Sequence, residues 1–214
     1  FDMAYFYDSA GDDRYYATPT YGLFRGPSDT FYTYAESFDR NYAFAQNGGF
    51  DMAYFSDSAG DDLFYATGTY GLFRDTMTSF YSYAESFDRL YADSSNGGND
   101  NAYFYDSAGN DRYYQTDSYS LLRGESSEFY HYAQGFNYVQ ANAENGGNDE
   151  AFIYDVGDED ELSCAGDDVS LTNGSESTSL AGFYRVVAES KAGETASAEV
   201  GAVDYIFEQV GDWE

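Results

Sequence analysis

Basic side chains are scarce in this sequence of 214 residues, which has 9 Lys and Arg against 39 Asp and Glu. The formal net charge is −30 at pH 7. Nucleic acids and anionic membrane surfaces attract proteins through Lys and Arg, so we expect neither as a partner. A polyanion of this kind repels itself, and salt or bound cations would favour its compact state.

Cysteine, histidine and long apolar runs are also nearly absent. The one cysteine, Cys164, allows no internal disulfide, and we expect its thiol to be buried. The one histidine, His131, takes a repeat position held elsewhere by Thr33 and Ser82, and we expect it on the surface. No apolar run approaches the ~20 residues of a membrane helix, so we expect no membrane insertion. No Ser-His-Asp arrangement is supported by the spacing, and we do not expect an enzyme.

Aromatic residues and glycine, by contrast, are abundant. The sequence holds 25 Tyr, 18 Phe and 22 Gly but only 2 Pro. Tyr and Phe favour β-strands, where the ring packs on a half-buried sheet surface. Gly and Asp favour tight turns. The aromatic content also gives this acidic chain enough apolar surface to form a core, which distinguishes it from a disordered polyanion.

The strongest feature is a 49-residue repeat. Residues 1–6 return at 50–55, 49 positions later, and the pattern recurs at 100–104 and 149–153. Three full copies span 1–49, 50–98 and 99–147. A degenerate fourth copy spans 148–214, and we expect it to act as a C-terminal cap. The sequence begins at Phe1, inside the first copy, so we expect a processed product or a fragment.

Each copy is expected to form short strands separated by Gly- and Asp-rich turns. Comparison of the copies indicates which side chains point inward. The Ala4 position is Ala in every copy, the Phe6 position stays apolar, and the Asn41 position is aliphatic in the later copies. In the first copy the expected strands are Ala4–Asp8, Arg14–Thr18, Tyr21–Arg25, Phe31–Ala35 and Asn41–Ala45.

This pattern predicts an all-β fold. A weaker echo inside each copy, between residues 7–15 and 34–42, indicates about two coils per 49-residue repeat. We therefore predict a right-handed parallel β-solenoid, or β-helix, in which equivalent side chains of successive copies stack into ladders. Tyr5, Tyr54 and Tyr103 would form one such ladder. The alternative is a four-bladed β-propeller, since blades of about 40–50 residues are usual.

The acidic turns are the candidate metal site. In a solenoid, equivalent aspartates would lie in columns about 4.8 Å apart, where carboxylates either protonate or share a cation. Ca²⁺ takes about six to eight oxygen ligands, which Asp side chains and Gly-rich turns supply. The alternative is a solvated acidic edge that prevents edge-to-edge pairing. The candidate ligands are Asp8, Asp12, Asp13, Asp57, Asp61, Asp62, Asp106 and Asp111, with Asp100 and Asp149 from the Gly-Gly-Asn-Asp turns.

Two families share parts of this pattern. The segments Tyr7–Asp13, Ser37–Arg40 and Asn96–Asp100, with the tail Ala202–Trp213, resemble tandem repeats of giant acidic surface and secreted proteins of planctomycetes and other aquatic bacteria. This resemblance implies a bacterial exoprotein and brings no catalytic residues with it. Residues Gly97–Ala102 are more distantly similar to calcium-binding nonapeptide β-roll repeats, although one required Gly and the nine-residue period are missing.

These observations predict an extracellular or cell-surface structural or adhesive protein. Its repeats would build or join a surface fibre or matrix, stabilised by Ca²⁺, through head-to-tail contact with other copies or flanking repeats. One alternative is a carbohydrate-binding module that binds surface glycans through exposed Tyr. A second alternative is a β-helical enzyme that degrades polysaccharides, since a fold does not fix a function.

Overall fold

The computed structural model describes residues 2–126 and 128–214, so Phe1, where the first copy starts, lies outside the described residues. These residues form strands joined by turns, with a short 3₁₀ turn at Pro27–Asp29. No helix in the described ranges is long and apolar enough to cross a membrane. The strands are β1 (Met3–Tyr7), β2 (Arg14–Ala17), β3 (Tyr21–Arg25), β4 (Tyr32–Glu36), β5 (Arg40–Phe44), β6 (Met52–Ser56), β7 (Asp62–Ala66), β8 (Tyr70–Asp75), β9 (Tyr81–Glu85), β10 (Arg89–Asp93), β11 (Asn101–Tyr105), β12 (Asp111–Gln115), β13 (Ser120–Gly124), β14 (Tyr130–Gln134), β15 (Tyr138–Asn142), β16 (Glu150–Val156), β17 (Glu161–Gly166), β18 (Asp168–Asn173), β19 (Glu176–Ala181), β20 (Arg185–Ser190), β21 (Ala198–Val203) and β22 (Ile206–Val210).

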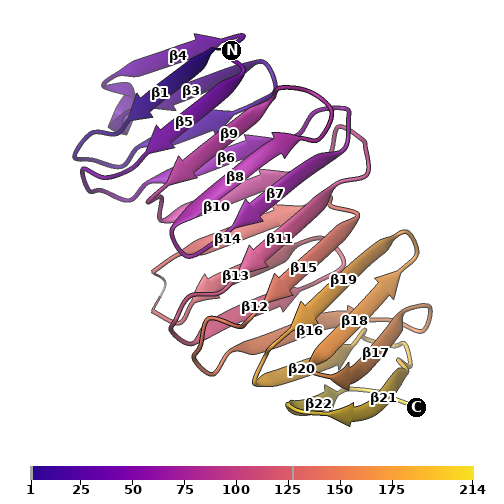
Figure 1. Cartoon of the computed structure of the whole chain (residues 1–214). Helices are drawn as coiled ribbons and strands as arrows, with labels where there is room; N and C mark the ends of the chain where they lie inside the picture. The colour runs from indigo at the N-terminus through magenta and orange to yellow at the C-terminus, as the bar shows by residue number, and fades with distance from the viewer. Residues whose placement is uncertain (1, 127) are drawn as a thin grey trace.

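The strands stack into two facing sheets along one axis, with the chain ends at opposite ends of the stack (Figure 1). Across the described residues each sheet has 11 strands. Sheet 1 has the order β1-β5-β9-β8-β7-β11-β15-β19-β18-β17-β21, and sheet 2 has the order β4-β3-β2-β6-β10-β14-β13-β12-β16-β20-β22. The predicted β-solenoid is confirmed, and the four-bladed propeller is wrong because the strands do not divide into separate blades.

Each copy folds into a single strand, an antiparallel three-strand meander in the opposite sheet, and a second single strand in the first sheet. In the first copy these are β1, then β2–β4, then β5. The single strands pair in parallel with neighbouring strands, as β1 does with β5 and β2 does with β6. Three crossings between the sheets occur in each of the three full copies, counting the crossing into the following copy, so the next copy starts in the opposite sheet.

This odd number of crossings decides which residues of successive copies stack on one another. Since one turn needs two crossings, each copy makes one and a half turns rather than the predicted two. Equivalent residues of successive copies therefore lie in opposite sheets and cannot form ladders. Tyr5 and Tyr103 are in sheet 1 and Tyr54 is in sheet 2. The predicted same-position ladders are wrong, because the sequence repeat does not show the antiparallel meander.

The core lies between the two sheets and follows the alternation of each strand. In β6, Ala53 and Phe55 are buried while their neighbours are partly exposed. The Phe55 ring lies 5.8 Å from the Phe64 ring and 5.9 Å from the Phe73 ring, measured between centroids. Such aromatic pairs add about 0.5–1.5 kcal/mol each beyond area burial. The predicted inward rows are buried: Phe6, Phe55, Phe104 and Ile153, and Asn41, Leu90, Val139 and Val186.

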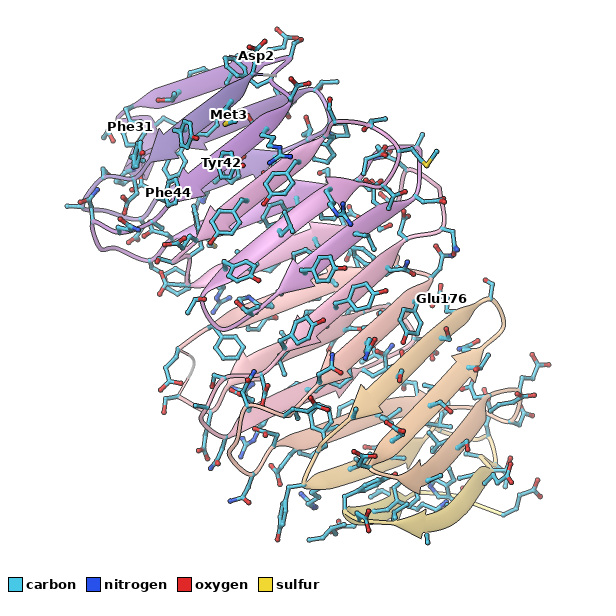
Figure 2. All side chains as sticks on the ribbon, in the orientation of Figure 1. Asp2, Met3, Phe31, Tyr42, Phe44 and Glu176 are labelled. Carbon is cyan, nitrogen blue, oxygen red and sulfur yellow. The ribbon has the colours of Figure 1, made fainter. Side chains whose placement is uncertain are left out.

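The outer faces carry rows of tyrosine rings that stack on one another. In sheet 2, the rings of Tyr16, Tyr54 and Tyr91 stack with centroids 5.0 and 5.1 Å apart. In sheet 1, Tyr42 lies in such a row on the face toward the viewer in Figure 2, and its ring is 5.2 Å from that of Tyr5. Ladders thus form between different repeat positions.

Two single-occurrence residues are buried. Cys164 is buried as predicted, and burial raises the pKa of its thiol. His131 is only 1% exposed, so its predicted surface location is wrong. Its ring stacks on Phe129 at 4.8 Å, and Nε2 donates to the carbonyl oxygen of Thr67 at 2.6 Å. This repeat position, which is Thr33 and Ser82 in the other copies, faces the core in β14.

Burial of His131 makes stability depend on pH. Burial lowers its pKa from 6.5 to about 4, so the unfolded chain binds this proton first as the pH falls. The stability from the neutral ring is complete above pH 6.5 and is lost as the pH falls toward 4, at up to about 1.4 kcal/mol per pH unit. Urea unfolding of wild type and His131→Ser between these pH values should show that the free energy of unfolding falls less steeply with falling pH in the variant. Equal slopes would contradict the burial of a neutral ring.

Candidate metal centre

Each copy contains an acidic turn between its first strand and its meander. In the third copy this turn runs from Asp106, after β11, to Asp111, the first residue of β12. The Asp111 carboxylate accepts the backbone N–H of Ser107 at 2.6 Å, which closes the turn. The same bond occurs from Ser9 to Asp13 and from Ser58 to Asp62, at 2.8 Å in both.

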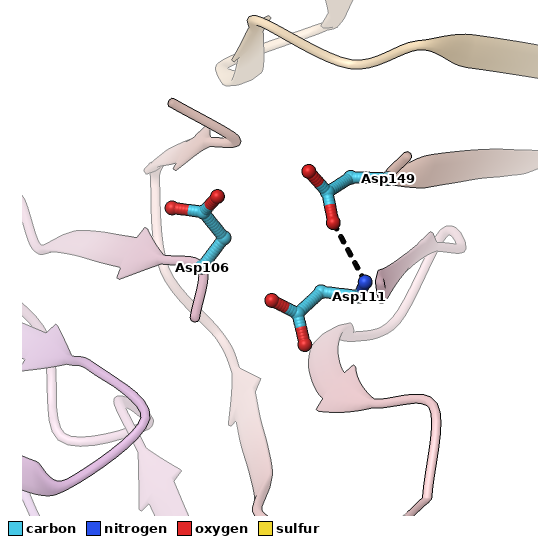
Figure 3. Close-up of side chains that lie close together, drawn as sticks. All are labelled: Asp106, Asp111 and Asp149. Atoms are coloured by element: carbon cyan, nitrogen blue, oxygen red, sulfur yellow. Dashed lines mark hydrogen bonds between the residues drawn. The ribbon is translucent and has the colours of Figure 1, made fainter. Parts of the chain in front are cut away.

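A second aspartate reaches this turn from the next copy. Asp149 precedes β16, and its Oδ1 accepts the backbone N–H of Asp111 at 2.6 Å (Figure 3). Because β12 and β16 are neighbours in sheet 2, this bond joins the starts of two strands from adjacent copies. Asp51 accepts from Asp13 at 2.8 Å, and Asp100 from Asp62 at 2.7 Å, in the same way.

The first aspartate of the acidic turn accepts hydrogen bonds from a second turn. This second turn contains Gly-Gly and follows the last strand of the copy. Asp106 accepts the backbone N–H of Asn145 at 2.9 Å and its side-chain Nδ2–H at 2.8 Å. The pairs Asp8 with Asn47 and Asp57 with Asn96 repeat this contact.

The Gly-Gly turn needs glycine at its second position. Gly147 has φ +105°, and a Cβ there would collide with the carbonyl oxygen of Gly109 in the acidic turn. Gly146 has the same φ but faces open space. The close backbone contact at Gly147 lets Asp149 reach Asp111.

In the third copy the three aspartates form one cluster. Asp106, Asp111 and Asp149 are 4%, 1% and 2% exposed. One carboxylate oxygen of each lies within 4.8 Å of those of the other two, and the carboxylates of Asp111 and Asp149 turn toward the side of Asp106 (Figure 3). Oδ1 of Asp111 is buried without a hydrogen-bond partner. In the described part of the chain, no Lys or Arg forms an ion pair with these carboxylates.

Burial disfavours the charged form of all three groups. Loss of hydration raises the pKa of Asp106 and Asp111, and it raises the pKa of Asp149 to about 6. The charges of the neighbouring aspartates add to this effect at Asp111 and Asp149. Buried carboxylates this close together favour either protonation or a shared cation.

The second copy has the same three aspartates, but their carboxylates differ in hydrogen bonding and spacing. Asp57, Asp62 and Asp100 are buried, and Oδ1 of Asp62 has no hydrogen-bond partner. Here Asp100 also accepts the hydroxyl of Ser94, a position that is Ala45 and Ala143 in the other full copies. Among the described residues, the close three-carboxylate spacing is found around Asp111 and not here.

The remaining candidate ligands have other places. Asp13 is buried, but Asp8 in the same turn is partly exposed. Asp12 and Asp61 are exposed and accept the backbone N–H groups of Phe50 and Asn99, both at 2.9 Å. They therefore connect adjacent turns and lie apart from the buried oxygens.

The predicted columns of equivalent aspartates are not formed. Asp8 and Asp106 follow strands of sheet 1, and Asp57 follows a strand of sheet 2, so their turns alternate between the two edges of the solenoid. The cluster instead combines three different positions of the repeat. The amide of Asn145, also in this site, was interpreted from sequence only as part of a turn, although Asn recurs there at Asn47 and Asn96.

Oxygen is the only ligand type that the cluster offers. Carboxylates suit hard cations such as Ca²⁺ and Mg²⁺, whereas Zn²⁺ and copper prefer imidazole or thiolate. His131 and Cys164 are both buried elsewhere in the core. No protein-family model, curated protein or solved structure matches this chain.

The Gly-Gly turn gives a stability test with a matched control. Gly147→Ala should lower the free energy of unfolding by about 1–3 kcal/mol more than Gly146→Ala, because only the first adds a backbone collision. Both glycines have φ +105°, so left-handed strain is common to the two variants. Denaturant unfolding measures the difference, and equal losses would show that the two turns do not pack as described.

Proposed function

We propose that this chain is a structural or adhesive segment of an extracellular bacterial surface fibre or matrix, in which solenoids join head to tail. The distribution of exposed apolar side chains carries this proposal. Such groups mark contact surfaces when they gather in one place. Most of the large ones in the described residues lie on the end strands or beside them: Met3, Tyr5, Tyr7, Tyr32, Tyr34 and Phe38 at the N-terminal end, and Val200, Ile206 and Val210 at the C-terminal end.

Phe38 is far more exposed than the equivalent Phe in the other copies. It is 39% exposed, whereas its counterparts Phe87, Phe136 and Phe183 are 6%, 5% and 4% exposed. Phe87 packs against Tyr15 and Phe24 of the preceding copy, with centroids 6.3 and 6.1 Å apart. The Phe38 position is therefore built to insert between aromatic rings of a neighbouring repeat.

The strand edges at the two ends are compatible with one another. β1 and β4 each have one paired neighbour, as do β21 and β22. The strand pairings make β22 and β4 run in the same direction in sheet 2, and β21 and β1 in the same direction in sheet 1. Stacking a second solenoid in line would thus create parallel pairs in both sheets, as between successive turns inside the molecule. Unpaired edges of this kind template association.

The extracellular location rests on composition and resemblance. A net charge of −30 suits a protein exposed to salt and divalent cations, and the repeat resembles those of bacterial surface proteins. The carbohydrate-binding alternative needs exposed ring faces, but rings such as Tyr16, Tyr54 and Tyr91 are stacked on one another. The polysaccharide-degrading alternative has no feature of the site in its favour.

Sedimentation analysis tests the head-to-tail contact. The chain should self-associate as its concentration rises, into linear species rather than a closed dimer, because the two ends present different surfaces. Phe38→Asp places a charge in the interface and should weaken association at least 10-fold. Met77→Asp is the matched control, because Met77 is 84% exposed on a turn of the second copy and should leave association unchanged.

Several outcomes would reject the proposal. A chain that stays monomeric at high concentration, with and without Ca²⁺, lacks the contact. Association that Phe38→Asp leaves intact would place the interface elsewhere. Binding to a glycan array, or release of sugars from polysaccharides, by the monomeric chain would support one of the two alternatives instead.

A further inference from the structure

We propose that Asp106, Asp111 and Asp149 form a Ca²⁺ site that fastens the third copy to the fourth. The site does not depend on head-to-tail assembly, since all three residues belong to one chain and lie away from both ends. Asp106 and Asp111 come from the acidic turn of the third copy, and Asp149 lies at the beginning of the fourth copy.

The observation that points most directly to a cation is the Asp111 side chain. It is 1% exposed and lies among two other carboxylates, yet its Oδ1 has no partner. A buried carboxylate oxygen without a partner loses its hydration and gains nothing in return, which is costly. The same unpartnered oxygen recurs at Asp62 in the second copy, whereas in the first copy the Ser9 hydroxyl donates to Oδ1 of Asp13 at 3.3 Å.

The surroundings select the type of ligand. Three carboxylates within 4.8 Å of one another fit around one ion whose oxygen ligands lie about 2.3–2.6 Å away, as they do for Ca²⁺. Mg²⁺ holds its ligands at about 2.0–2.1 Å in a strict octahedron and gives up water reluctantly. The hydrogen bonds from Asn145, Ser107 and the Asp111 amide fix the carboxylates in place, so the larger and more adaptable Ca²⁺ suits them better.

A cation here would connect both sheets. Asp106 directly follows β11 of sheet 1, Asp111 is the first residue of β12 in sheet 2, and Asp149 directly precedes β16 of the same sheet. One ion would therefore join three strands and two copies at a single edge of the solenoid. It would also remove the repulsion among three buried carboxylates.

The copies differ in a way that limits the number of sites. In the second copy the Ser94 hydroxyl already satisfies Asp100, and in the first copy Asp8 is partly exposed. We therefore expect one strong site per chain, with weaker binding at the other two turns.

Calorimetric titration of the chelator-treated whole chain with CaCl₂, at physiological salt, measures stoichiometry and affinity. One strong site per chain is expected, with Mg²⁺ at least 10-fold weaker. Asp111→Asn and Asp149→Asn should each weaken Ca²⁺ binding at least 10-fold. Asp12→Asn is the matched control, because it removes one acidic charge from the corresponding turn and the third copy itself has Asn110 at that position.

Thermal unfolding provides the second measurement. Ca²⁺ should raise the melting temperature of wild type and of Asp12→Asn more than it raises that of Asp111→Asn. An equal rise in all three proteins would mean general screening of the acidic surface and would overturn the proposal, as would the absence of binding at 10 mM Ca²⁺. If the variants fail to fold, Tyr-sensitised Tb³⁺ luminescence of wild type decides: displacement of one tightly bound Tb³⁺ by Ca²⁺ supports the site, and many weak, equivalent sites reject it.

Discussion

A hydrogen bond from the backbone amide of one buried aspartate to the carboxylate of the next links each full copy of the stack to the copy that follows it. It joins Asp13 to Asp51, Asp62 to Asp100 and Asp111 to Asp149, and each time it ties the first meander strand of one copy to the first strand of the following copy. Strand ends leave backbone N–H groups unpaired, and buried donors without acceptors are costly. The carboxylates supply those acceptors, so the acidic turns are part of the framework. The inward Phe and Ala rows then add the burial that holds the two sheets together.

The local structure was largely predictable from the sequence, because it depends on patterns within a few residues. Alternation identified the inward Phe6 and Asn41 rows, and the Gly-Gly turns fell where positive φ is required. The order of the strands in the sheets was not predictable in the same way. The meander pairs antiparallel through contacts that the repeat pattern does not specify, and this pairing moves each copy to the opposite sheet.

The same limit applies to the site. Ten aspartates were candidates, and the sequence could not show which of them meet, because Asp149 lies far along the chain from Asp111 and reaches it only through the close approach of two turns. His131 shows the converse error. Its row is polar in each of the three full copies, as a surface row would be, yet Ser82 and His131 face the core and find hydrogen-bond partners there. A polar row with small or satisfied side chains cannot be distinguished from a surface row by composition alone.

Because successive copies start in opposite sheets, an even and an odd number of copies give solenoids with different ends. Two copies restore the starting sheet, so the true translational unit of the solenoid is a pair of copies. With four copies, the last strands, β21 and β22, lie in the same two sheets that hold the first ones, so in-line stacking would continue each sheet into its own counterpart. Loss or gain of one copy would exchange the sheets at one end, and neighbours would then have to rotate by half a turn to keep both sheets continuous. Duplication or deletion of copies in pairs would therefore leave the sheets at both ends unchanged, whereas a single-copy change would exchange them at one end.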